Sequence, residues 1–203
     1  MSPSGAVYAA DRLAEIRAAN ELNVCIWSDY FAISYRNPRT QVLEGLDIDM
    51  ATLLAKSLDV RVSFIESSFS QLSDNLKANR CDIAMHGIGV RESRKADMSF
   101  STPYLASGIY AVSSKHSRYI TRWRDIDRAG NVAVVQKGTY MEPVAKRTFK
   151  QADIRVVDSF KAREQDVLSG RADVFLTDYP YGKRMVTLTD WAKLLEPQTP
   201  LAK

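Results

Sequence analysis

The stretch Cys81–Tyr104, CDIAMHGIGVRESRKADMSFSTPY, places a short apolar run directly before two glycines and a basic cluster. The run at residues 83–85 is typical of a buried strand. Because Gly87 and Gly89 lack side chains, a ligand can approach the backbone after this strand and accept hydrogen bonds from N–H groups. Arg94 follows, and a guanidinium is suited to holding a carboxylate through two parallel bonds. The stretch therefore predicts a strand end that binds an anionic group.

Strand-like and helix-like patterns alternate on both sides of this stretch. Before it, strands are expected at NVCIW and RVSFIES, and a helix at DIDMATLLAKSL with Ile48, Leu53 and Leu54 facing inward. Residues 30–44 are expected to form an irregular loop. After it, strands are expected at IYAVSS, VAVVQ, IRVVD and DVFLTD. The alternation predicts parallel sheets with right-handed crossovers, in two α/β lobes with a cleft between them.

Composition and charge exclude several classes of function. The 203 residues are 45% hydrophobic and 26% charged, as in ordinary globular proteins. No apolar run approaches the ~20 residues that span a bilayer. The net charge of +4 is spread among interleaved acidic and basic residues, which indicates a solvated surface rather than a nucleic-acid groove.

Cysteines and histidines are too few to predict a metal site. The chain has two of each, without metal-ligand spacing, so neither a metal nor a cofactor is expected. Cys25 and Cys81 both fall in apolar strand-like runs. The preferred interpretation is two buried thiols, and the alternative is a disulfide, if the sheet brings them together.

Complementary groups lie at the other predicted strand ends, where open α/β sheets bind ligands. Thr139 and Tyr140 open a helix after VAVVQ, and helix N-terminal amides favour an anion. Asp178 ends DVFLTD and supplies a carboxylate that can hold an ammonium group. Aromatic faces for the part of a ligand between the two charges come from Trp27, Tyr30 and Phe69.

A cation for a carboxylate and an anion for an ammonium are what a free α-amino acid requires, because desolvating a zwitterion is costly unless each charge is paired. Each residue also has a purely structural interpretation. Arg94 alone would be a surface charge, Asp178 a cap of the turn-rich TDYPYG, and Tyr30 and Phe69 parts of the core. His86 is equally a pocket group or a satisfied strand-end histidine. Convergence at the same face of both lobes favours binding.

The chain resembles the bacterial extracellular solute-binding proteins, family 3, the periplasmic partners of amino-acid uptake transporters. Four segments carry the resemblance: LEGLDIDMATLLAKSLDVRVSFIES, LKANRCDIAMHGIGVRESRKADMSFSTPYL, VAVVQKGTY and SGRADVFLTD. It runs from about Leu13 to about Pro200. The resemblance implies a two-lobed, type II periplasmic-binding-protein (Venus-flytrap) fold, with a hinge and an interlobe cleft that closes on its ligand.

The resemblance also implies boundaries. Lobe 1 is expected at residues 13–107 and lobe 2 at 108–195. Residues 1–12, which lack the basic and apolar regions of a signal peptide, are expected to be a tag or linker. Residues 196–203 are expected to begin a return crossover to lobe 1, so the chain looks truncated.

Roles in ligand binding are implied position by position. Arg94 would clamp the ligand carboxylate, Asp178 would bind the ammonium, and Tyr30 and Phe69 would sandwich the side chain. Further ligand contacts are expected from Trp27, His86 and the backbone of Gly87, Gly89, Thr139 and Tyr140. Two departures matter: Gly89 stands where relatives usually carry a hydroxyl, and Trp27 where many carry an Asp.

The implied function is extracytoplasmic (periplasmic) binding of an amino acid or related small carboxylate, with a transporter permease as partner and without nucleic acid. Neither a signal peptide nor a membrane anchor is expected within these 203 residues. One alternative is the periplasmic sensor domain of a membrane signalling receptor.

A second alternative is an enzyme, because the loop CIWSDYFAISYR is similar to that of the related cyclohexadienyl (arogenate/prephenate) dehydratases. Those enzymes are understood to carry a catalytic Glu three residues after the strand-end Asp, where this chain has Tyr181. Without a general acid, elimination loses its main assistance. A catalytic site is therefore not expected.

Overall fold

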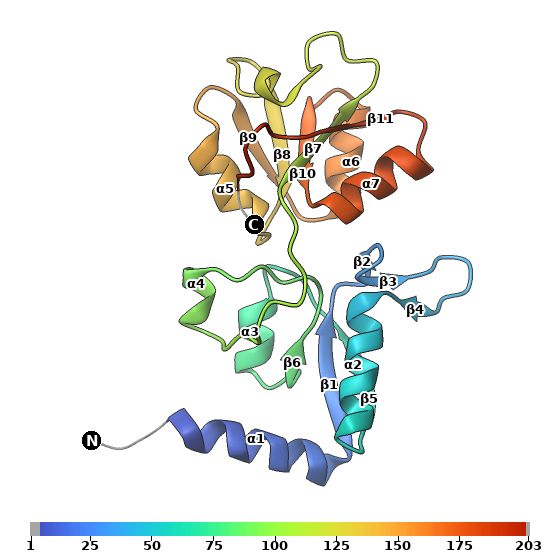
Figure 1. The fold of residues 1–203 in the computed structure, drawn as a ribbon, viewed down its shortest axis with the longest axis vertical. Helices are drawn as coiled ribbons and strands as arrows, with labels where there is room; N and C mark the ends of the chain where they lie inside the picture. The colour runs from blue at the N-terminus through green and yellow to red at the C-terminus, as the bar shows by residue number, and fades with distance from the viewer. Residues whose placement is uncertain (1–4, 202–203) are drawn as a thin grey trace. The chain divides into compact units, whose positions relative to one another are not determined.

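The computed structural model describes the backbone of residues 5–201 and the side chains of residues 12–201, and it divides into two compact units (Figure 1). Lobe 1 extends to Phe100 and lobe 2 begins at Ser101. Of the predicted terminal segments, residues 1–4 and 202–203 lie outside the described part. Within that part, no helix has the length and apolar character needed to cross a membrane.

Lobe 1 is built on a parallel sheet of three strands in the order β5-β1-β6. The strands are β1 (Glu21–Ile26), β5 (Arg61–Glu66) and β6 (Ile83–Ala84). The helices are α1 (Gly5–Ala19), α2 (Leu46–Ser57), α3 (Leu72–Lys77) and α4 (Glu92–Lys95). The expected loop at residues 30–44 instead contains most of a small antiparallel sheet: β2 (Asp29–Tyr30), β3 (Ser34–Arg36) and β4 (Leu43–Glu44).

The core of lobe 1 lies between β1, α1 and α2, and its main members are Ile16, Leu22, Val24, Ile26, Ile48, Ala51 and Ala55. The helix α2 buries Ile48, as predicted, but the prediction for Leu53 and Leu54 was wrong. These two leucines are 65% and 39% exposed. The helical period places residues 48, 51 and 55 on one stripe, which turns Leu53 and Leu54 away from the sheet.

Lobe 2 is built on a five-stranded sheet in the order β11-β7-β10-β8-β9. Its strands are β7 (Tyr110–Ser114), β8 (Val132–Gln136), β9 (Asp153–Val157), β10 (Val174–Thr177) and β11 (Ala192–Leu195). β8, β9 and β10 are parallel, but β7 runs antiparallel to both β10 and β11. The sheet is therefore mixed rather than purely parallel, since no α-helix lies between β7 and β8 and the crossover rule for parallel strands does not apply to this connection.

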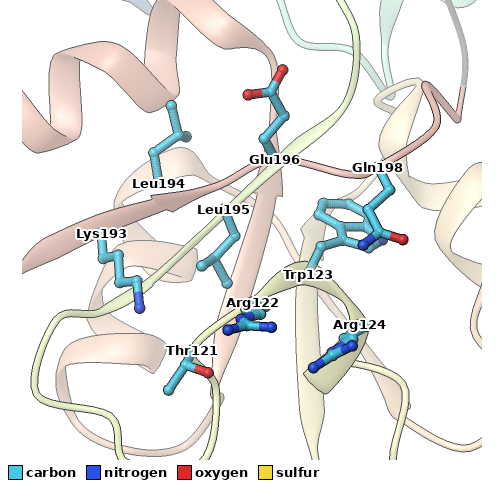
Figure 2. Close-up of a pocket in the computed structure, with 9 residues that line it drawn as sticks. All are labelled: Thr121, Arg122, Trp123, Arg124, Lys193, Leu194, Leu195, Glu196 and Gln198. Carbon is cyan, nitrogen blue, oxygen red and sulfur yellow. The ribbon is translucent and has the colours of Figure 1, made fainter.

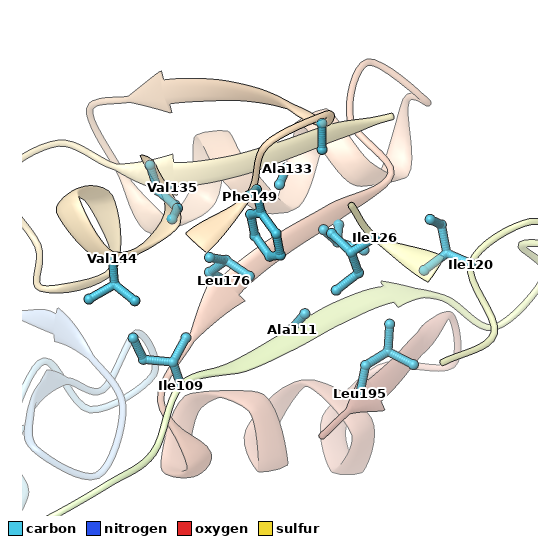
Figure 3. Close-up of a cluster of buried hydrophobic side chains, with 13 residues drawn as sticks. Ile109, Ala111, Ile120, Ile126, Ala133, Val135, Val144, Phe149, Leu176 and Leu195 are labelled. Carbon is cyan, nitrogen blue, oxygen red and sulfur yellow. The ribbon is translucent and has the colours of Figure 1, made fainter. Parts of the chain in front are cut away.

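Helices cover both faces of the lobe 2 sheet: α5 (Met141–Thr148), α6 (Phe160–Leu168) and α7 (Tyr179–Leu188), with a 3-10 turn, η1, at Trp123–Asp125. Val174 and Leu176 of β10 join α5 side chains in the core cluster of Figure 3. Because side chains alternate along a strand, Phe175 points to the other face, where its ring contacts Tyr181 of α7.

Cys25 and Cys81 form a disulfide, with their Cα atoms 5.5 Å apart. The preferred prediction of two buried thiols was therefore wrong. Cys25 lies in β1 and Cys81 lies two residues before β6, and these neighbouring strands bring the two residues to the usual bridging separation. The sequence separation of 56 residues gave no information about this pairing.

Candidate ligand-binding site

An aromatic cluster lies beyond the strand ends of lobe 1. The ring of Phe69, which follows β5, lies 6.3 Å from Trp27 and 6.1 Å from Tyr30 by ring centroids. On its other side Phe69 meets the imidazole of His86 at 4.9 Å, edge to face. Trp27 and Tyr30 follow β1 and His86 follows β6, so three strands contribute to one cluster. The structure thus brings these four side chains together within lobe 1.

Gly87 leaves the space that the Tyr30 ring occupies in this cluster. Its φ angle is +64°, in the left-handed region, and an added Cβ would lie 2.7 Å from Cε1 of the Tyr30 ring. Glycine is therefore required for two reasons, backbone conformation and space. Its N–H, which we expected to face a ligand, donates instead to Oδ2 of the buried Asp47 at 2.8 Å.

Arg94 lies in α4 and is buried, with 4% of its surface exposed. Its Nη1 donates to the carbonyl oxygen of Gly89 at 2.7 Å. Burial, together with the nearby charge of Arg91, lowers the pKa of Arg94 to about 10. Arg94 is thus not the solvated surface charge of the structural interpretation, and it still carries its positive charge at neutral pH.

His86 is fully buried and neutral. Its Nδ1 lies 3.3 Å from the carbonyl oxygen of Cys25, and its Nε2 meets no hydrogen-bond partner among the side chains of residues 12–201 or the described backbone. Burial lowers the pKa of His86 to about 4; the hydrogen bond to Cys25 opposes this shift, and the charge of Arg94 adds to it. Gly89, whose carbonyl oxygen accepts the hydrogen bond from Arg94, lies three residues after His86 on the segment that follows β6.

In lobe 2 the expected anion-binding loop follows β8. Thr139 is buried, and its hydroxyl donates to the carbonyl oxygen of Gln136 at 2.8 Å. Tyr140 is the N-cap of α5 and packs against the lobe 2 core. Glu142, in the first turn of α5, accepts the Gly138 N–H at 2.9 Å. The chain therefore already places one carboxylate of its own at this helix N-terminus.

Asp178 follows β10 and is buried. It caps α7, with its Oδ1 accepting the Tyr181 N–H at 2.9 Å. The structural interpretation of Asp178 is thus observed. Since a carboxylate has about four acceptor positions, capping does not prevent it from also accepting hydrogen bonds from a ligand.

Tyr181 occupies the position where the resemblance to dehydratases implies a catalytic Glu. Its ring is buried against Phe160, at 4.7 Å, and its hydroxyl donates to the carboxylate of Glu164. Burial raises the pKa of Tyr181 well above its usual value. The residue is therefore neutral and directed into the interior of lobe 2, where it is unsuited to act as an acid at neutral pH.

Sequence reasoning missed Arg163, a residue of α6 whose guanidinium contacts the end of the strand β10. The signal was present, because Phe160, Arg163 and Val167 share one face of α6 at helical spacing, and all three are buried. An arginine between two apolar positions of a core-facing stripe indicates a buried charge.

One pocket of about 300 Å³ lies elsewhere in lobe 2, between the loop that contains η1 and the strand β11 (Figure 2). It is lined by Thr121, Arg122, Trp123, Arg124, Lys193, Leu194, Leu195, Glu196 and Gln198. None of the predicted ligand-binding residues lines it. In the described residues, no group of three or more His, Cys, Asp or Glu side chains could hold a metal ion.

Comparison with known proteins agrees with this architecture. A crystal structure of an ancestral amino acid-binding protein, a precursor of cyclohexadienyl dehydratase, superimposes with a TM-score of 0.83 at 30% sequence identity, covering 91% of this chain and 80% of that chain. The predicted two-lobed, type II periplasmic-binding-protein fold is thereby confirmed.

Two relatives show similarity along the sequence. The chain is 31% identical over 191 residues to the cyclohexadienyl dehydratase of Pseudomonas aeruginosa, covering 93% of this chain and 70% of that protein. It is 30% identical over 136 residues to the L-cystine-binding protein TcyJ of Escherichia coli (strain K12), covering 67% of this chain and 51% of that protein. The chain thus spans from about half to about 70% of these relatives. Residues 22–140 match the family described as bacterial extracellular solute-binding proteins, family 3, and the chain belongs to this family.

Proposed function

We propose that the chain binds a free α-amino acid, or a related small carboxylate, through opposite charges supplied by its two lobes. Arg94 holds the carboxylate and Asp178 holds the ammonium group. The observation that carries the proposal is that Arg94 is buried in lobe 1 and its guanidinium is held at the Gly89 carbonyl, on the segment that also contributes His86 to the aromatic cluster. A guanidinium placed there offers a planar fork for a carboxylate out of competition with water.

The ligand side chain lies against the aromatic cluster of Trp27, Tyr30 and Phe69. Such rings accept aromatic and aliphatic groups and also stack on cationic ones. The name of the TcyJ relative, an L-cystine-binding protein, supports an amino-acid ligand. Backbone groups at Gly89, Thr139 and Tyr140 assist with the carboxylate, and the Gly87 N–H is omitted from this set because Asp47 accepts it.

The proposal is tested by a thermal-shift screen against the twenty amino acids. A ligand that binds only the folded state must raise the melting temperature, by an amount that grows with its concentration. We expect at least one amino acid to raise it at millimolar concentration. A flat response to all twenty would favour a module that binds no small molecule and contacts a partner protein.

We propose that the protein lies outside the cytoplasm and is the ligand-binding partner of a membrane permease. The disulfide between Cys25 and Cys81 supports this location, since such bonds persist in oxidising compartments. A sensor domain of a membrane receptor would use the same ligand chemistry. The two settings are distinguished by uptake of labelled ligand in cells that lack the gene: loss of uptake supports a transporter, and unchanged uptake a sensor.

A second candidate function is that of a dehydratase, which the 31% identity to the Pseudomonas aeruginosa enzyme favours. The buried, neutral Tyr181 speaks against it. Incubation with prephenate or arogenate distinguishes the two candidates. We expect no phenylpyruvate or phenylalanine to form, and sustained turnover would establish the enzyme instead.

A further inference from the structure

Arg163 is a buried positive charge in lobe 2, with 1% of its surface exposed. Three aromatic rings surround its guanidinium carbon, at 3.9 Å from the ring centroid of Phe160, 4.8 Å from Phe175 and 4.6 Å from Tyr181. It forms no ion pair with any carboxylate within residues 12–201. Ring faces stabilise a cation, but burying a charge without a paired anion remains costly.

The hydrogen bonds of Arg163 are directed at one short segment of β10. Nη1 donates to the carbonyl oxygen of Leu176 at 2.8 Å, and Nη2 donates to the hydroxyl of Thr177 at 3.2 Å. Both acceptors are fully buried. They are the last two residues before Asp178, so the guanidinium fixes the backbone and side chain that lead into this carboxylate.

Arg163 is also linked to Asp178 through Tyr181. The Tyr181 ring lies against Arg163, and the Tyr181 N–H donates to Asp178 Oδ1. The Tyr181 hydroxyl is in turn bonded to Glu164 and accepts a hydrogen bond from Arg184 at 3.2 Å, which fixes the ring. Arg163 therefore contacts the residues immediately before Asp178 and the residue that donates to it.

We propose that Arg163 is a positioning residue for the ammonium subsite, which orients the carboxylate of Asp178 by holding Leu176, Thr177 and Tyr181. This inference rests on the proposed role of Asp178 in binding an α-ammonium group. It goes further in assigning the selectivity of that subsite to a residue of α6 that does not itself contact the ligand.

Amide hydrogen exchange tests the positioning without any ligand. Arg163→Met keeps an unbranched, apolar side chain at this position and removes the guanidinium with the two donors that bond β10. We expect protection of the Tyr181 amide to fall about tenfold or more in this variant. Protection of the Val132 amide, which donates to the Asp173 carboxylate in the same lobe, should stay unchanged and serves as the internal control.

Arg171→Met is the matched control variant, because it makes the same substitution in lobe 2 at an arginine whose guanidinium pairs with Asp166 instead. We expect it to leave the Tyr181 amide protected to within about threefold. If Arg163→Met does not fold, Thr177→Val removes one acceptor while keeping the shape, and should lower Tyr181 protection less but in the same direction.

Calorimetric titration then tests selectivity with three pairs of probes: L-leucine, L-phenylalanine and L-arginine, each beside its desamino analogue (4-methylpentanoate, 3-phenylpropanoate and 5-guanidinopentanoate). For a probe that binds the wild type, Arg163→Met should weaken the amino acid about tenfold and leave the desamino analogue unchanged. Equal loss for both members, or unchanged Tyr181 protection, would overturn the inference. Absence of binding by the wild type would instead count against the proposed function, while the exchange result still decides the positioning role.

Discussion

The N–H of Gly87 donates to the carboxylate of Asp47, and this bond joins the loop after β6 to the first turn of α2. Asp47 is fully buried, and its position in the first turn also places a negative charge at the helix N-terminus. The segment that begins with His86 and leads to Arg94 is therefore fixed to the helix that covers the lobe 1 sheet.

Replacing Asp47 should destabilise lobe 1. Asp47→Ala leaves the Gly87 N–H without this acceptor, and we expect the free energy of unfolding to fall by about 2 kcal/mol. Urea denaturation measures the change. Asp49→Ala is the control, since Asp49 lies in the same first turn but is exposed. A similar loss in both variants would mean that the helix N-terminal charge, and not the bond to Gly87, accounts for the effect.

Gly87→Ala should displace the Tyr30 ring. Gly170 provides the comparison, because its φ angle of +72° is similar but an added Cβ there meets nothing within 4 Å. We expect Gly170→Ala to cost about 1 kcal/mol from backbone strain alone. Gly87→Ala should cost about 1–2 kcal/mol more, because the methyl group overlaps Tyr30. Thermal unfolding measures both, and equal costs would show that Tyr30 adapts without loss.

Arg94→Ala should weaken ligand binding more than any surface change. Leaving the ligand carboxylate buried without its partner is expected to cost roughly 3 kcal/mol of affinity. Calorimetric titration with the amino acid found in the thermal-shift screen measures this cost. Lys95→Ala removes the neighbouring, exposed charge that pairs with Glu92, and should bind as the wild type does. Wild-type affinity in the Arg94 variant would refute its assignment.

His86 should make stability depend on pH in the acid range. Its pKa is about 4 in the folded protein and near 6.5 when unfolded, so the unfolded state binds the proton more readily. Its contribution is fully present above pH 6.5 and decreases as the pH falls toward 4, by up to about 3 kcal/mol. Urea titrations from pH 7 to 4 should show a smaller decrease in His86→Gln than in the wild type. Parallel curves would contradict the lowered pKa.

The disulfide should contribute a large part of the stability of lobe 1. We expect the double variant Cys25→Ala, Cys81→Ala to lose about 3 kcal/mol of unfolding free energy, because the unfolded chain is no longer cross-linked. Urea denaturation measures the loss. The wild type treated with a reducing agent should move toward the variant, and an unchanged midpoint under reduction would show that the bond is not accessible to it.

The alternation of strands and helices was predictable because hydrophobic period is a local property of the chain. The direction of β7 was not, because it depends on how the chain enters lobe 2. Pairing of Cys25 with Cys81 depends on which strands are neighbours, and sequence spacing does not encode this. Leu53 and Leu54 were predicted to face the core because they are apolar, but the helical period places them on the exposed face of α2.

The candidate site was predicted at the level of residues more than of contacts. Trp27, Tyr30, Phe69 and His86 lie together, because parallel strands end at one edge of a sheet, although the sequence left the place of His86 open. The partners of backbone amides could not be read from the sequence. The Gly87 N–H donates to Asp47 and the Gly138 N–H donates to Glu142. Each acceptor lies on a helix that comes close to the glycine only when the chain folds.

The pairing of Glu142 matters for how a zwitterionic ligand would bind. Its carboxylate is already paired with Lys146 and with the Gly138 N–H, so Asp178 is the lobe 2 carboxylate that the proposed function assigns to an ammonium group, as it assigns Arg94 of lobe 1 to the carboxylate. Under the proposed function, the two halves attract opposite ends of a zwitterion. In the reverse orientation its carboxylate would meet Asp178 and its ammonium group Arg94, so under this proposal like charges select the orientation of the ligand and the aromatic rings select its side chain.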